Sequence, residues 1–287
     1  MGLFGSSCTA AGSERTGLCA SVDQRGADAL AHVCSAGAIS VATNPADQPQ
    51  SWFDADGNTW QGFNVDVANE IAARLGVTAR FTSIPTGADG TASAAIGTDE
   101  MNVTSRKITR QGRLDTVFTP PYYYLPASIA VSDGETSIED LSTDLDGKRI
   151  CVASGSTYAS YLDGTLHLPS VAPKFAFLVD GADIVRFPTD EDALAALARG
   201  SMGCDAAMTG LPTIERSIQA GQRLKVVGDP LFYEPLGIGF AKSDSSEERT
   251  LVAAVSGIVQ DMHDDGTLTA LSVKWFGMDL TTGRPPS

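Results

Sequence analysis

The sequence predicts an α/β protein of two lobes. Segments in which hydrophobic and polar residues alternate, as in strands, take turns with segments that have one apolar helical face. This pattern occurs in both halves of the chain, and 287 residues correspond to about two domains of ordinary size. Hydrophobic residues make up 43% of the chain, so each half has apolar side chains for its own core.

Glycines and turn residues separate the elements of the first half. Val65, Ile71 and Leu75 share one face of an amphipathic helix, which Gly76 ends. The sequence DADG at 54–57 is typical of a hairpin turn. The predicted elements are, in order, a short helix at 29–33, a strand at 38–42, the turn at 54–57, a helix at 63–75 and a strand at 77–84.

The second half repeats this alternation. The turn Gly155-Ser156-Thr157 enters a helix, and Asp264-Asp265-Gly266 separates the last two helices. The other predicted elements are a short helix at 138–141, strands at 148–153, 185–187, 205–209, 224–227 and 236–241, and helices at 190–199, 247–263 and just before 277.

The charge excludes two classes of partner. Subtracting 20 Lys and Arg from 35 Asp and Glu gives a formal charge of −15. Nucleic acids and anionic membrane surfaces are bound by clustered Lys and Arg, so neither is expected as a partner. No apolar stretch reaches the roughly 18 residues that a membrane-spanning helix needs.

The cysteines and the first residues bear on the compartment. Residues 1–35 are expected to be a tether or the remnant of a removed leader, and Cys8 leaves lipid anchoring open. The five cysteines show no metal-ligand spacing, so they are either buried thiols or disulfides of an oxidising compartment. Cys151 and Cys204 each stand at the start of a predicted strand, and we predict a disulfide between them.

Sequence signals of catalysis are absent. The chain has no GxSxG and no GxxxxGK[ST] motif, and Gly237-Ile238-Gly239 lacks the third glycine of a dinucleotide fingerprint. The three histidines lie far apart. We therefore predict no catalytic residue, no metal site and no cofactor.

Several motifs along about residues 36–278 together resemble one family, the extracytoplasmic solute-binding proteins that serve polar amino acid ABC importers (bacterial extracellular solute-binding protein family 3). No single motif is diagnostic, but their order and spacing are specific. They are ISVATNP at 39–45 followed by ADG at 55–57, QGFNVDVA at 61–68, IT at 108–109 followed by FTPPYYY at 118–124, GKRI at 147–150 with GST at 155–157, DGTL at 265–268 and KWFG at 274–277.

The resemblance implies a two-lobed fold of the type II periplasmic binding proteins, with a ligand cleft between the lobes. Lobe 1 would comprise residues 36–124 and 243–287, and lobe 2 residues 125–242, with hinge crossings near 124–127 and 237–242. The implied protein is a monomer, periplasmic or extracellular, that captures a small polar solute and delivers it to an ABC permease in the membrane.

The resemblance also implies a ligand site. Gly155-Ser156-Thr157 would offer hydroxyls and N–H groups to an anion, although an ordinary helix cap explains the same residues. The implied ligand-binding residues are Asn44, Asp47, Gln50, Trp52, Thr104, Ser105, Arg106, Lys107, Arg113, Ser156, Thr157 and Thr209.

The chain departs from the family pattern at the positions that usually bind an amino acid. The carboxylate-binding Arg falls on Gly112, and the amine-binding Asp falls on Gly210. Arg106 and Lys107 stand where the family has uncharged residues, and we expect one of them to bind an anionic group of the ligand. The ligand would then be an amino acid derivative or a small organic anion. If both cations face solvent, the ligand stays an amino acid, with Arg110 or Arg113 binding its carboxylate.

Two other functions are compatible with this fold, because fold alone does not determine function. One is a lyase- or dehydratase-like enzyme, and the other is the ligand-sensing domain of a receptor. No acid–base pair stands out at the implied pocket positions, so the binding protein is the preferred prediction.

Overall fold

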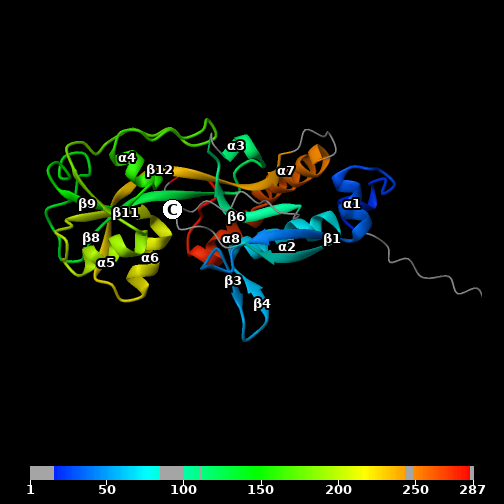
Figure 1. The fold of residues 1–287 in the computed structure, drawn as a ribbon, viewed down its shortest axis with the longest axis horizontal. Coiled ribbons are helices and arrows are strands. Elements are labelled where there is room, and N and C mark those ends of the chain that lie inside the picture. The colour runs from blue at the N-terminus through cyan, green and yellow to red at the C-terminus, as the bar shows by residue number, and fades with distance from the viewer. Residues whose placement is uncertain (1–15, 85–99, 110–111, 243–247, 285–287) are drawn as a thin grey trace, which may run out of the picture.

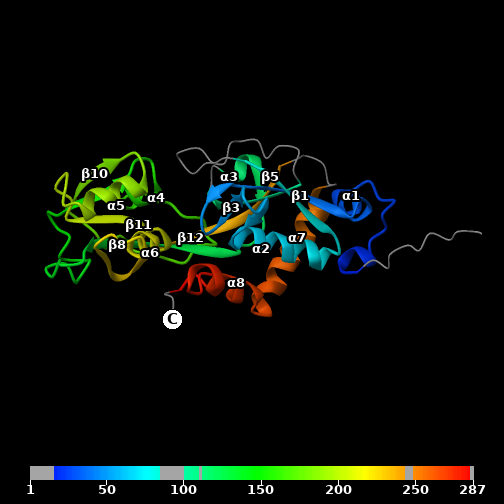
Figure 2. The same ribbon diagram turned by 90° about the horizontal axis from the view of Figure 1, so that it is seen from below.

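A computed structural model describes residues 16–84, 100–109, 112–242 and 248–284. Two groups of elements lie at opposite ends of the molecule, and the long strands β8 (Tyr123–Ser132) and β12 (Leu224–Ala241) run between them (Figure 1). The same arrangement is visible after a 90° turn (Figure 2). The two-lobed α/β fold expected from the sequence is therefore confirmed.

The first lobe is built around parallel strands. β1 (Ala38–Thr43) pairs in parallel with β5 (Thr78–Ser83) and β6 (Met101–Lys107), and β6 pairs antiparallel with β12. The remaining elements of this lobe are η1 (Leu18–Ala20), α1 (Ala29–Ala36), β2 (Ala46–Asp47), β3 (Ser51–Asp54), β4 (Thr59–Gln61), α2 (Phe63–Leu75), α3 (Gly112–Asp115), β7 (Thr116–Phe118), α7 (Glu248–Asp264) and α8 (Thr267–Phe276).

Helix α2 shows how the sequence motifs build this lobe. Gly62 precedes the helix at φ 123°, and a Cβ there would lie 2.4 Å from the backbone oxygen of Gln50, so only glycine fits. Phe63 then packs against Tyr123 and Phe276, with ring centroids 5.1 Å and 5.0 Å away. These aromatic residues therefore belong to the core of the lobe.

Asp66 of the same helix joins two of the motifs. Its Oδ2 accepts hydrogen bonds from Lys274 Nζ and Trp275 Nε1, both at 2.7 Å. The C-terminal KWFG motif is thus attached to the QGFNVDVA motif, although about 200 residues separate them in the sequence.

The second lobe has its own parallel strands. β9 (Arg149–Ala153) lies between β10 (Asp183–Phe187) and β11 (Ala206–Gly210), and β11 pairs antiparallel with β8. Its helices are α4 (Thr157–Leu162), α5 (Asp190–Ala198) and α6 (Leu211–Gln219). Sheet pairing continues through both lobes in the order β10-β9-β11-β8-β12-β6-β1-β5.

Two disulfides occur in the described residues. Cys151 and Cys204 are bonded, with Cα atoms 5.8 Å apart, as predicted from their strand positions. Cys19 and Cys34 form the second bridge, which attaches the segment before α1 to that helix. Cys8 lies outside the described residues.

Each hinge strand passes from the hydrophobic core of one lobe to that of the other. Tyr123 at the start of β8 belongs to the first core, and Ala127 belongs to the second. In β12 the change occurs between Phe232 and Leu236, before the segment 237–242 where we expected the second crossing. Leu125 pairs with Glu234 at the centre of this region. The C-terminal segment also reaches the hinge, because Tyr124 N donates to Leu280 O at 2.7 Å.

Some local predictions were wrong. Residues 138–141 form no helix, because Asp144 Oδ2 accepts hydrogen bonds from the amides of Glu139 and Asp140 and stabilises a turn. The strands predicted at 224–227 and 236–241 are parts of the single strand β12. Helix α6 was not predicted, although Pro212 stands in its first turn. Within the described ranges, no helix has the length and hydropathy to cross a membrane.

Candidate functional site

Lys107, the last residue of β6, joins the two lobes. Its Nζ lies 2.9 Å from Glu234 Oε2 and donates a hydrogen bond of 3.0 Å to the Thr157 hydroxyl at the start of α4. The ammonium also lies 5.1 Å from the ring centroid of Tyr158, which permits a cation–π interaction. The Lys107 ammonium is thus the point where residues of a first-lobe strand, a second-lobe helix and the hinge come together.

Glu234 is a buried carboxylate at the hinge. Its side chain is 1% exposed, and its Oε1 has no hydrogen-bond partner among the described residues. A buried ion costs several kcal/mol unless a counter-charge compensates it, and Lys107 supplies that charge.

Asp190 and Thr209 place further polar groups near this pair. Asp190 is the first residue of α5, and Thr209 is near the end of β11. Asp190 Oδ1 and Thr209 Oγ1 are both buried, and within the described part of the chain neither has a hydrogen-bond partner of good geometry. Burial raises the pKa of Asp190 to about 6. Thr209 and Lys107 oppose this increase, and the charges of Glu191 and Glu234 add to it.

Gly210 follows Thr209, and a side chain at this position would fit tightly. A Cβ at this position would lie 3.0 Å from Tyr158 Oη and 3.3 Å from the side chain of Leu125. The family's carboxylate could not enter here without moving these residues. The carboxylate near this strand end is that of Asp190, whose Oδ1 is buried.

Arg216 of α6 is a second connection between the lobes. It donates hydrogen bonds to the backbone oxygen of Gln48 in the first lobe and, at 2.9 Å, to Glu191 Oε1. Burial raises the pKa of Asp47 to about 6, while the Arg216 charge opposes this and the Glu191 charge adds to it.

Two hollows lie beside Arg216. One, of about 250 Å³, lies between the lobes and is lined by Gln48, Pro49, Pro212, Glu215, Arg216, Gln219, Trp275, Phe276 and Gly277. The other, of about 440 Å³, is lined by Pro45, Ala46, Gln48, Trp52, Phe53 and Arg216. We use the term cleft for the region between the lobes. It comprises the contacts of Lys107, the contacts of Arg216 and the first of these hollows.

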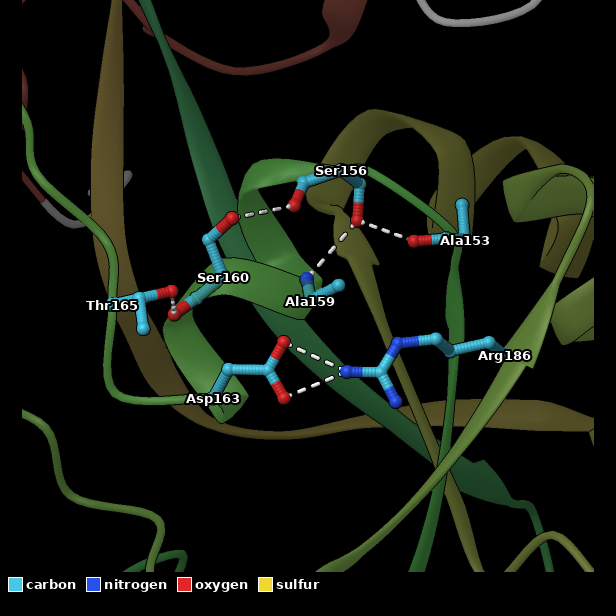
Figure 3. A network of polar contacts seen from close by, with 7 residues as sticks. All are labelled: Ala153, Ser156, Ala159, Ser160, Asp163, Thr165 and Arg186. Atoms are coloured by element: carbon cyan, nitrogen blue, oxygen red, sulfur yellow. Dashed lines mark hydrogen bonds and ion pairs between the residues drawn. The ribbon is translucent and has the colours of Figure 1, made fainter.

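Ser156 is engaged within its own lobe. Its hydroxyl accepts a hydrogen bond from Ala159 N at 3.0 Å and donates one to Ala153 O at 2.8 Å, as Figure 3 shows. This is the geometry of an N-terminal helix cap. In the same view Ser160 donates to the Ser156 backbone oxygen, and Arg186 pairs with Asp163.

Thr104 and Ser105 also have partners inside the first lobe. Thr104 Oγ1 donates to Asn102 Oδ1 at 2.6 Å, and Asn64 Nδ2 donates to the Ser105 hydroxyl at 2.9 Å. Tyr122 donates to Asn64 at 2.7 Å and completes this chain. Ser105 has φ 55°, an uncommon conformation for a serine at the point where β6 reaches the cleft.

Arg106 has different neighbours from Lys107. Its guanidinium carbon lies 6.0 Å from the ring centroid of Phe118, and its Nη1 has no hydrogen-bond partner in the described ranges. Burial lowers the pKa of Arg106, and Asp115 opposes the decrease. Successive side chains of a strand point to opposite faces, which explains why the two cations are separated.

Four predicted residues remain: Asn44, Gln50, Trp52 and Arg113. Asn44 Oδ1 accepts a hydrogen bond from Ala46 N at 3.0 Å, and Gln50 Oε1 is buried without a hydrogen-bond partner among the described residues. Trp52 packs edge-on against Trp275, with centroids 5.5 Å apart. Arg113 in α3 is exposed, and Arg110 lies outside the described residues.

The structure therefore brings Lys107 and Thr157 into contact and places Thr209 beside Asp190, which is itself close to Lys107. Sequence reasoning missed Glu234, Asp190, Tyr158 and Arg216. For Glu234 a signal existed, because it is the one charged residue in the segment 231–241, where an unpaired charge is costly. In the described ranges, no group of His, Cys, Asp and Glu is arranged to hold a metal ion.

Comparison with known proteins assigns the chain to a family. The family model of the bacterial extracellular solute-binding proteins, family 3, matches residues 39–278. The L-cystine-binding protein TcyJ of Escherichia coli K12 is 27% identical over 238 residues, which are 81% of this chain and 80% of that protein. The L-arginine-binding protein of Pseudomonas aeruginosa is 25% identical over 251 residues, covering 84% and 89% of the two chains.

A solved structure shows the same fold. The crystal structure of an ancestral amino acid-binding protein, described as a precursor of cyclohexadienyl dehydratase, superposes with a TM-score of 0.63 at 25% identity. The match covers 87% of this chain and all of that one (100%). With the two lobes and the polar groups between them, these findings show that the chain belongs to the bacterial extracellular solute-binding proteins of family 3 and is the solute-binding component of an ABC importer.

Proposed function

We propose that the chain captures a polar amino acid or an amino acid derivative between lobe 1, residues 36–124 and about 236–287, and lobe 2, residues 125 to about 232. The observation that carries this proposal is the position of Lys107, which contacts Thr157 of the other lobe and Glu234 of the hinge. A ligand between the lobes would meet polar groups from both at this point. The bound solute is then delivered to a permease in the membrane.

The named relatives support the amino acid class. TcyJ is named for L-cystine and the Pseudomonas protein for L-arginine. The contacts of the cations point the same way, because Lys107 is paired with Glu234 and Arg106 lies against Phe118. A small organic anion would have to compete with these contacts, so it is the weaker candidate.

The ligand-facing residues that we propose differ in part from the family pattern. Lys107 and Thr157 are in contact between the lobes, Thr209 lies near Asp190, and Asp47 lies near Arg216. Trp52 lines the second hollow beside Arg216, and Gln50 stands two positions before it in the sequence. Asn44, Thr104, Ser105 and Ser156 would support these groups through their hydrogen bonds.

Ligand capture would close the lobes about the strands β8 and β12. Only two strands join the lobes within the described ranges, and rigid-body closure about such a hinge is a common response to a ligand. The closed cleft would bury the ligand and exclude water from its charged groups.

The test is a binding screen of the purified chain. Isothermal titration calorimetry would measure the twenty amino acids, their common derivatives and small dicarboxylates, and native mass spectrometry would identify any compound that co-purifies. We expect one amino acid-like compound to bind in a 1:1 ratio and to reduce the radius of gyration measured by X-ray scattering. Saturable binding with no change in scattering would contradict capture between closing lobes.

We further propose that the chain is a binding protein and not an enzyme. Its named relatives are binding proteins, but the structural neighbour described as a precursor of a dehydratase makes this worth testing. Mass spectrometry after prolonged incubation with the bound compound should recover it unchanged. Recovery of a dehydrated or cleaved product would favour the lyase-like alternative.

We also propose a location and an oligomeric state. Two disulfides are typical of an oxidising compartment, which supports a periplasmic or extracellular location. We propose that the protein is a monomer that Cys8 can attach to the cell surface through a lipid. Size-exclusion chromatography with light scattering tests the first point, and mass spectrometry of the native N-terminus tests the second.

A further inference from the structure

The chain continues past α8 toward the hinge. Gly277 ends this helix in the left-handed conformation, at φ 73°. The Ser272 hydroxyl then holds the residues that follow, because it donates to Met278 O at 2.8 Å and accepts from Leu280 N at 2.9 Å. Leu280 is 3% exposed and belongs to the core of the first lobe. The beginning of the segment 278–284 is therefore fixed to the first lobe.

The same segment contacts the hinge and the second lobe. Leu280 O accepts a hydrogen bond of 2.7 Å from Tyr124 N in β8. Three positions later Gly283 is buried at φ 62°, and a Cβ there would lie 3.2 Å from Tyr124 Cγ and 2.9 Å from Pro173 Cγ. Pro173 belongs to the second lobe, between α4 and β10. A residue without a side chain permits this close approach, so the segment packs between the hinge strand and the second lobe.

The loop that carries Pro173 is long but fixed. It runs from residue 163 to residue 182 without a helix or strand, and ordered loops of more than about 12–15 residues are uncommon and usually functional. Tyr161 of the second core holds this loop, because its Oη donates to Ala176 O at 2.9 Å and accepts from Leu178 N at 2.8 Å. Pro173 is therefore expected to move with the second lobe.

The contacts of the segment lie on both sides of the hinge. β8 passes from the first core to the second between Tyr123 and Ala127. A rotation of the lobes about this region would move Pro173 relative to Gly283. The contact between these two residues therefore exists in the described arrangement of the lobes and is lost when they rotate far apart.

We propose that residues 278–284 form a strap that crosses the hinge and holds the lobes in the described arrangement. In this arrangement Lys107 and Thr157 from opposite lobes are in contact, as capture between the lobes requires. The strap lines neither of the two hollows, so it acts on closure and not on the solute. A contact that favours the binding arrangement raises the apparent affinity without touching the ligand. The effect on affinity rests on the proposed function, whereas the effect on the lobes needs no solute.

The experiment removes the contact from each side. A chain that ends at Thr281 lacks Gly283, and a chain that ends at Arg284 is its matched control. In the second lobe, Pro173→Ala removes the ring that contacts Gly283, and Pro169→Ala alters a proline of the same loop as the control. X-ray scattering would measure the radius of gyration without solute. Calorimetry with the twenty amino acids and L-cystine would measure affinity.

We expect a larger radius of gyration for the chain ending at Thr281 and for Pro173→Ala, because the open arrangement gains population. Each should bind the strongest of the titrated compounds about three- to tenfold more weakly than the wild type, as for the loss of one or two buried CH₂ groups. The chain ending at Arg284 and Pro169→Ala should match the wild type in both measurements.

Urea unfolding separates a lost strap from a lost fold. If the chain ending at Thr281 no longer unfolds in a cooperative transition, its last residues are needed for folding, and Pro173→Ala, which keeps the whole segment, decides the question. Wild-type scattering of Pro173→Ala would overturn the inference. A larger radius with an affinity within twofold of the wild type would also overturn it, because the strap would then not favour the binding arrangement.

Failure of the proposed function would look different. If the wild type bound no compound of the full screen, solute capture would be refuted. The scattering comparison of solute-free chains would then still decide whether the strap holds the lobes.

Discussion

At the scale of single residues, buried charge is the main feature of the cleft. Glu234 is nearly inaccessible to solvent and depends on Lys107, whereas Arg106, the neighbour of Lys107 in the sequence, lies against Phe118 without a described hydrogen-bond partner for Nη1. Two adjacent cations therefore contribute differently to stability, because only one of them compensates a buried carboxylate.

Lys107→Met should reduce the free energy of unfolding by about 3 kcal/mol, because it leaves Glu234 buried without a counter-charge. Urea unfolding at pH 7.5 would measure the loss. Arg106→Met, the matched control, should cost less than about 1 kcal/mol, since methionine keeps the packing on Phe118. Adding Glu234→Gln to Lys107→Met should restore most of the loss, and a double variant no more stable than Lys107→Met would refute this account.

The carboxyls of Asp47 and Asp190 predict a pH dependence. Burial raises the pKa of both from 3.8 to about 6, so the folded chain binds more protons than the unfolded chain between these values. Stability should therefore fall as the pH rises from about 4 to about 6 and level off above that. Asp265, with a pKa lowered to about 2, acts only at lower pH and in the opposite direction.

Thermal unfolding at several pH values from 4.5 to 7.5 would test this dependence. A variant that combines Asp47→Asn with Asp190→Asn should show a flatter profile than the wild type. Profiles of equal slope would show that neither carboxyl titrates abnormally in the folded chain.

At the scale of elements, the parallel strands of the second lobe are held by a covalent bond. The disulfide between Cys151 in β9 and Cys204 before β11 spans 53 positions of the sequence, and the Cys19–Cys34 bridge spans 15. A longer closed loop restricts the unfolded chain more, so the first bridge should contribute more to stability.

Replacing Cys151 and Cys204 with serine should reduce the free energy of unfolding by about 4 kcal/mol, and replacing Cys19 and Cys34 by about 3 kcal/mol. Denaturant unfolding of both variants under non-reducing conditions would compare them. A larger loss for the Cys19–Cys34 variant would contradict the loop-length argument.

At the scale of the whole molecule, the described parts of the two lobes touch through few polar contacts outside the hinge. Arg216 donates to Gln48 O across the cleft, and Lys107 donates to Thr157. Such contacts hold the lobes together only weakly, because exposed charges lose most of their attraction to solvent screening. A ligand can therefore change the balance between open and closed arrangements with a modest binding energy.

Arg216→Ala should shift this balance toward the open arrangement. We expect a larger radius of gyration by X-ray scattering and a three- to tenfold weaker affinity for the bound solute, as for the loss of one charge-assisted hydrogen bond worth about 1 kcal/mol. Arg199→Ala, which alters an exposed arginine of the same lobe, is the control. Scattering curves and affinities that match the wild type would show that Arg216 does not control closure.

The local sequence determined most of the elements and their order. Alternation and amphipathic spacing located β1, α2, β9 and α5, because these patterns depend on neighbours only a few positions apart. The order of the motifs indicated the family, and the strand positions of Cys151 and Cys204 indicated their bridge. The predicted helix at 138–141 failed because Asp144, just outside it, binds the backbone amides that a helix would use.

The charges of the cleft were decided only by the tertiary structure. Lys107 and Glu234 are 127 positions apart, counted from their residue numbers, and Asp47 and Arg216 come from different lobes. No local pattern records which carboxylate a lysine will meet, since the pairing depends on how β6, β12 and α4 cross at the hinge. The sequence therefore determined that the chain binds a polar solute in a two-lobed fold, whereas the packing of the lobes decided which side chains are left to bind it.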